Sequence, residues 1–79
     1  VLLDREMDAP VVEEIREVVE AEGNDAKVVD LHVWRVGQHA YACALSVVTG
    51  KRSLSASALR EQLGVHEEIV HSTIEVHYL

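Results

Sequence analysis

The stretch from residue 26 to residue 50, AKVVDLHVWRVGQHAYACALSVVTG, constrains the fold of this 79-residue chain more than any other. Its two halves are rich in β-branched and apolar residues, and the pair Gly37-Gln38 lies between them. Such residues favour β-strands, and glycine at the first position of a two-residue loop fits a type II′ turn. The sequence therefore predicts an antiparallel hairpin with its turn at Gly37-Gln38.

Successive residues of a strand point to opposite faces of a sheet, so each arm of the hairpin divides into two sets. In the first arm, one predicted face carries Val29, Leu31 and Val33. The opposite predicted face of the first arm carries Val28, Asp30, His32, Trp34 and Val36. In the second arm, the two alternating sets are Tyr41, Cys43, Leu45 and Val47 against Ala42, Ala44 and Ser46.

An amphipathic helix is predicted before the hairpin, in MDAPVVEEIREVVEAEGND. Asp8 is a suitable N-cap, Pro10 lies in the first turn, and Gly23 is expected to end the helix. Apolar residues recur at helical spacing and form one stripe: Val11, Val12, Ile15, Val18 and Val19. The acidic residues of this segment, including Glu13 and Glu14, are interpreted as a solvated face.

A second, shorter helix is predicted after the hairpin, in GKRSLSASALREQLG, and a last strand begins at about Ile69. Ser53 or Ser55 caps this helix and Gly64 ends it. The predicted order is α-β-β-α-β, which is an α+β fold. Two helices cannot cover both faces of a three-stranded sheet, so both are expected to pack on one face and to leave the other open. The face expected to be covered is the one that carries Val29, Leu31, Val33, Leu45, Ile74 and Val76.

The length of the chain predicts one domain covering residues 1–79. The formal net charge of -7 argues against binding to nucleic acid or to anionic membrane surfaces. No apolar run is long enough to span a bilayer, so direct membrane insertion is not expected. The single cysteine, Cys43, is interpreted as a small buried hydrophobe.

The open face of the predicted sheet has the character of a metal site. In HSTIEVH, one side of the strand carries His71, Thr73, Glu75 and His77. Imidazole and carboxylate groups at alternate positions can converge on Zn²⁺, Co²⁺, Ni²⁺ or Mn²⁺. His32 on a neighbouring strand can add a ligand, and Asp30 is either a ligand or an acceptor that orients an imidazole.

Other groups are assigned no ligand role. His39 and His66 are interpreted as surface groups. No serine or cysteine nucleophile stands in a recognisable setting and no glycine-rich phosphate loop is present, so the chain is not expected to be an enzyme.

Three segments, LLDREMD, VVDLHVWRVG and HSTIEVH, resemble the cytoplasmic C-terminal domain of cation diffusion facilitator transporters, in the branch that exports cobalt, nickel or zinc. The resemblance implies a ferredoxin-like, metallochaperone-like fold attached to a transmembrane domain in a bacterial inner membrane, with residues 1–7 as the remnant of the linker from that transmembrane domain. It also implies a homodimer that binds metal at or near its interface and thereby regulates proton-coupled export.

Within this resemblance, Glu75 and His77 occupy the places where zinc-binding members carry histidine and aspartate. Val29 stands where those members have a histidine, and the segment ACALS lacks their middle-strand histidine. The predicted metal ligands are therefore His32, His71, Glu75 and His77, with Zn²⁺ as the expected ion and Co²⁺ or Ni²⁺ as alternatives. Two further hypotheses are a dimerisation module without metal and a ferredoxin-like dimer that binds a small organic ligand.

Overall fold

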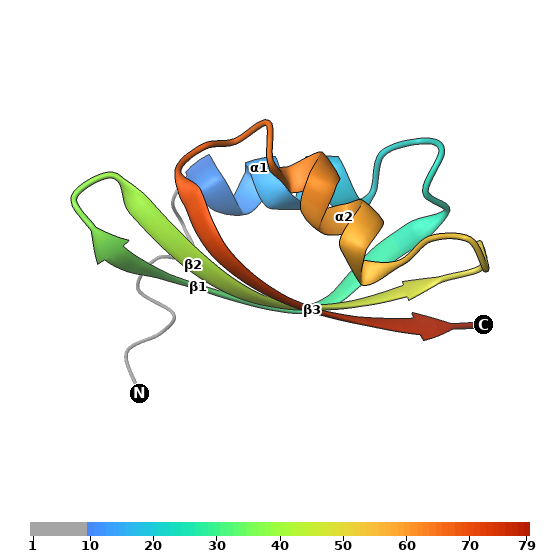
Figure 1. Ribbon diagram of the computed structural model, residues 1–79. Helices are drawn as coiled ribbons and strands as arrows, with labels where there is room; N and C mark the ends of the chain where they lie inside the picture. Colours follow the sequence, from blue (N-terminus) through green and yellow to red (C-terminus); the bar gives the residue numbers. More distant parts are fainter. Residues whose placement is uncertain (1–9) are drawn as a thin grey trace.

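The computed structural model describes residues 10–79. Five elements follow one another along the chain: α1 (Pro10–Val19), β1 (Ala26–Gly37), β2 (Ala40–Thr49), α2 (Ala56–Leu63) and β3 (Ile69–Tyr78) (Figure 1). The predicted N-cap Asp8 and the predicted linker remnant, residues 1–7, lie outside the described residues.

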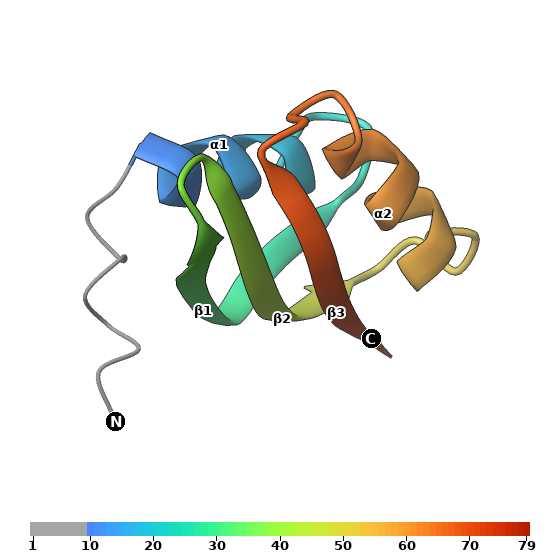
Figure 2. The same ribbon diagram turned by 60° about the vertical axis from the view of Figure 1, so that its left-hand side comes forward.

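The three strands form one sheet in the order β1-β2-β3, with β2 in the middle (Figure 2). β1 and β2 are antiparallel, whereas β2 and β3 are parallel and are joined by a crossover through α2. Figure 1 shows both helices on the same face of the sheet. The predicted ferredoxin-like α+β fold is thus confirmed: its element order is α-β-β-α-β and both helices lie on one side.

The core lies between the helices and the covered face of the sheet. The helices and the segment before α2 contribute the buried side chains Val11, Val12, Ile15, Val19, Leu54, Leu59 and Leu63. The sheet contributes Leu31, Val33, Cys43, Leu45 and Val47. The helical stripe and the period of two therefore identified most of the residues that pack together.

The helix ends agree with the prediction at α2 and differ at α1. Ser55 is the N-cap of α2, since its hydroxyl accepts a hydrogen bond from the Ala58 N–H at 3.0 Å, and Gly64 is its C-cap. α1 ends at Val19, before the predicted stop at Gly23. The reason is Asn24, whose buried side-chain amide donates to the carbonyl oxygens of Val18 at 3.2 Å and Val19 at 3.1 Å and so terminates the helix.

The predicted side-chain directions are wrong at the N-terminal end of β1. Val29 was expected to face the helices, but 60% of it is exposed, whereas Val28 packs against the core. A register shift between Val28 and Asp30 explains the difference, because a β-bulge adds one residue and reverses the alternation. The bulge lets Val28 and Leu31 share one face, and the Glu20 carboxylate accepts the Val28 N–H at 2.9 Å.

The predicted turn at Gly37-Gln38 is also wrong. Gly37 pairs with Ala40, so the two turn residues are Gln38 and His39. No glycine between residues 10 and 79 has a positive φ, which a type II′ turn would require at its first position. A turn without positive φ does not match the twist of regular strands, and a second register shift between Arg35 and Gly37 accommodates it.

Cys43 lies in the core with 1% of its surface exposed, and burial raises the pKa of its thiol to about 11. The nucleophilic thiolate is therefore almost absent at neutral pH. We expect native protein at pH 7.5 to react with a disulfide reagent such as DTNB only through unfolding. Chemically denatured protein serves as the control and is expected to react at once. Rapid labelling of the folded chain would contradict the burial of this thiol.

Candidate functional site

The face of the sheet opposite the helices carries most of the polar groups singled out from the sequence. Register pairing across the strands arranges them in rows. One row holds Asp30, Ser46 and Glu75, the next His32, Ala44 and Thr73, and the next Trp34, Ala42 and His71. The middle strand offers only small side chains along these rows, so the outer strands carry the ionisable groups.

Two carboxylate–imidazole pairs lie on this open face. Nε2 of His32 is 3.4 Å from Oδ1 of Asp30 on β1, and Nε2 of His77 is 3.3 Å from Oε1 of Glu75 on β3. Adjacent ligands of a tetrahedral zinc ion, each about 2.0–2.1 Å from the metal, are roughly 3.3 Å apart. Each pair therefore already has the spacing of two neighbouring ligands on one ion.

The structure does not bring all four predicted ligands to one point within a chain. β2 lies between β1 and β3, so the two pairs are separated by two strand spacings, roughly 10 Å. His71 lies on β3 roughly 13 Å along the strand from Glu75. Glu75 and His77 thus lie together, His32 lies beside Asp30, and His71 is apart from both pairs.

A second group of potential ligands lies at one end of the molecule and was not predicted. Glu14 of α1 meets His66 and Glu68 of the loop between α2 and β3, which passes beside the first turns of α1 (Figure 1). One ligand atom from each of these three residues lies within 4.8 Å of the other two. Among residues 10–79, it is the one group of three or more histidine, cysteine, aspartate or glutamate side chains close enough to hold a single metal ion.

Backbone hydrogen bonds hold the loop that carries two of these residues. The His66 N–H donates to the Leu63 carbonyl at 3.0 Å, and the Ile69 N–H donates to the His66 carbonyl at 3.0 Å. The Tyr41 N–H donates to the Glu68 carbonyl at 2.7 Å, which fixes the loop to the start of β2. The positions of His66 and Glu68 therefore follow from the turn after α2 and from the parallel pairing of β3.

The two carboxyl groups of this cluster influence each other. A hydrogen bond shared with the Glu68 side chain raises the pKa of Glu14, and partial burial and the negative charge of Glu68 add to the rise. The same hydrogen bond, together with a backbone N–H, lowers the pKa of Glu68. The pair thus holds a proton more firmly than isolated carboxylates would, as expected for two like charges in contact.

Sequence reasoning missed this cluster because its members lie far apart in the chain. Glu14 belongs to the acidic side of an amphipathic helix, which ordinarily faces water. The only local signal was the alternate spacing of His66 and Glu68 in VHEE, and that spacing indicates a shared direction only if the segment is extended.

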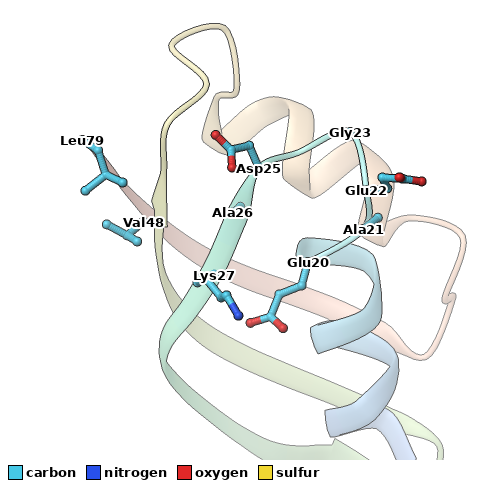
Figure 3. Close-up of a pocket in the computed structure, with 9 residues that line it drawn as sticks. All are labelled: Glu20, Ala21, Glu22, Gly23, Asp25, Ala26, Lys27, Val48 and Leu79. Atoms are coloured by element: carbon cyan, nitrogen blue, oxygen red, sulfur yellow. The ribbon is translucent and has the colours of Figure 1, made fainter.

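Figure 3 shows a hollow of about 480 Å³ at the opposite end of α1, lined by the α1–β1 loop, Lys27, Val48 and Leu79. Its three carboxylates, those of Glu20, Glu22 and Asp25, point in different directions and do not converge. Glu20 is already engaged with the Val28 N–H. This hollow therefore lacks a set of groups that could hold one ligand.

Comparison of the chain with protein-family models, with curated proteins and with solved structures finds no match. None of the helices in residues 10–79 is long and apolar enough to cross a membrane. A function for this chain therefore has to be inferred from its fold, from the open face of the sheet and from the cluster of Glu14, His66 and Glu68.

Proposed function

We propose that this chain is the cytoplasmic metal-sensing and dimerisation domain of a proton-coupled efflux transporter for zinc, cobalt or nickel. The observation that carries the proposal is the presence of two carboxylate–imidazole pairs, Asp30/His32 and Glu75/His77, on the outer strands of one uncovered sheet face. The resemblance to the cation diffusion facilitator family supports the same function. The proposal includes no enzymatic activity.

A second copy of the chain is the partner that would complete each pair. Two ligands leave a tetrahedral ion half coordinated, and a two-fold axis can supply the other half from the partner subunit. Ala42 and Ala44, which face this side from the middle strand, permit close approach of another surface. His71, placed on the same face, is available to an interface even though it is distant from Glu75 within one chain.

Charge explains how metal would act as a signal. The chain has 14 acidic and 7 basic residues, so two copies repel each other in the absence of a cation. A divalent ion held between the faces offsets that repulsion and draws the two domains together. In the proposed transporter this approach is passed to the attached transmembrane domain and favours transport. Imidazole combined with carboxylate suits Zn²⁺, and also Co²⁺ and Ni²⁺.

Isothermal titration of the purified, metal-free chain with Zn²⁺, with the mass followed by light scattering, tests this proposal. We expect saturable binding and a dimer whose formation is promoted by the metal. Because an imidazole binds metal only when neutral, affinity is expected to fall as the pH is lowered. A dimer that binds no metal would instead support a purely structural dimerisation module.

A further inference from the structure

Glu14, His66 and Glu68 form a compact ligand set that the open sheet face does not include. Glu68 precedes β3, whereas His77 lies near its end, so the two regions are separated by roughly 30 Å along the strand. One ion cannot bridge them. Any metal held by the cluster is therefore separate from the ions of the proposed dimer interface.

The spacing of the cluster fits a single ion. Nδ1 of His66 is 3.4 Å from Oε1 of Glu14, close to the roughly 3.3 Å that separates adjacent ligands of zinc. The Glu14 side chain is 34% exposed, but its Oε1 atom is buried and, when Glu14 and Glu68 are both ionised, has no hydrogen-bond donor among residues 10–79. A buried carboxylate oxygen without a partner is costly, and a cation would satisfy it.

The surroundings leave room for the rest of a coordination shell. A hollow of about 260 Å³ adjoins Glu14 and Glu68 and is also lined by His39 and Tyr41. This volume can hold water ligands, and His39 in the β1–β2 turn offers a further imidazole at its wall. Two carboxylates and one imidazole in a partly open site match the preferences of Zn²⁺, Co²⁺ and Mn²⁺.

We propose that Glu14, His66 and Glu68 bind a divalent transition-metal ion at a site distinct from the open sheet face. The ion joins the first turns of α1 to the loop that leads into β3. In the metal-free chain the two carboxyl groups are in contact there and hold a proton between them; a divalent ion takes the place of that proton and attracts both carboxylates. Metal binding at this site therefore fastens the helix to the end of the sheet.

Titration with Co²⁺, followed by visible absorption, tests the site in the 79-residue chain. Glu14→Gln and His66→Gln are each expected to weaken binding at this site by about tenfold or more, since even supporting groups of a metal site contribute that much. Glu67→Gln is the matched control, because it removes the same charge as Glu14→Gln from an exposed neighbour of Glu68. Equal affinity of Glu14→Gln, His66→Gln and Glu67→Gln would overturn the proposal.

The histidine ring signals in NMR spectra assign the ion to one region. Co²⁺ is expected to shift or broaden the His66 signals in the native chain and in His77→Ala, but not in Glu14→Gln at the same concentration. A response limited to His32 and His77 would overturn this site and leave the proposed function standing. A response at His66 without any at His32 or His77 would support this site and count against the proposed interface. Thermal unfolding without metal confirms that each variant is folded.

Discussion

Replacing Ile15 by alanine is expected to lower the free energy of unfolding by about 2–5 kcal/mol, the largest change we expect from a single substitution. The Ile15 side chain is 0% exposed and lies in the core cluster beside the buried stripe of α1 and the side chains of α2. Truncation removes apolar contacts and leaves a cavity that a backbone fixed by two helices and a sheet cannot fill. Small domains have only about 5–15 kcal/mol of stability in total.

Urea unfolding followed by far-UV circular dichroism measures this effect. Glu17→Ala is the matched control, since Glu17 is exposed on the same helix and its truncation is expected to change stability by no more than about 0.5 kcal/mol. Equal unfolding midpoints for the two variants would show that α1 does not form the core with the sheet.

The predictable part of the fold is the part that depends on local patterns. The stripe that includes Ile15 follows from a helical period. The start and the end of α2 follow from Ser55 and Gly64, which satisfy backbone groups within one turn. The start of β3 at Ile69 follows from a change of period. In each case the deciding interactions join residues close together in the sequence.

The facing of Val28 and Val29 could not be predicted in this way. Alternation assumes that each residue of a strand faces one residue of its neighbour, and a bulge breaks that assumption without a marker in the sequence. Here the bulge is favoured by the packing of Val28 on the core and by the Glu20 carboxylate, which comes from another element. Such a choice depends on tertiary contacts.

The candidate sites also contain a part that local sequence patterns predict and a part that depends on the tertiary arrangement. The Glu75/His77 and Asp30/His32 pairs could be predicted from the sequence because residues two apart on a strand share a face. Which pair could join which depends on strand order, and the placement of β2 in the middle separates them. The contact of Glu14 with His66 depends on how α1 lies over the sheet, which no local pattern records.

Replacing His77 by alanine is expected to weaken Zn²⁺ binding at the open face by more than about tenfold, because it removes a direct ligand where even supporting groups contribute that much. The His77 side chain is 55% exposed, so its loss is expected to leave the unfolding midpoint of the metal-free chain almost unchanged. Thr73→Ala, on the same face of β3, is the control. Isothermal titration of both variants with Zn²⁺ measures the difference.

The positions of the other histidines predict how strongly each substitution lowers the affinity for Zn²⁺. His32 is paired with Asp30, so His32→Ala is also expected to lower affinity, whereas His71 has no adjacent carboxylate on its strand and its loss is expected to matter less. Unchanged affinity in both His32→Ala and His77→Ala would remove the open-face site. A larger loss in His71→Ala than in His77→Ala would show that the interface assembles its ligands from different rows of the two subunits.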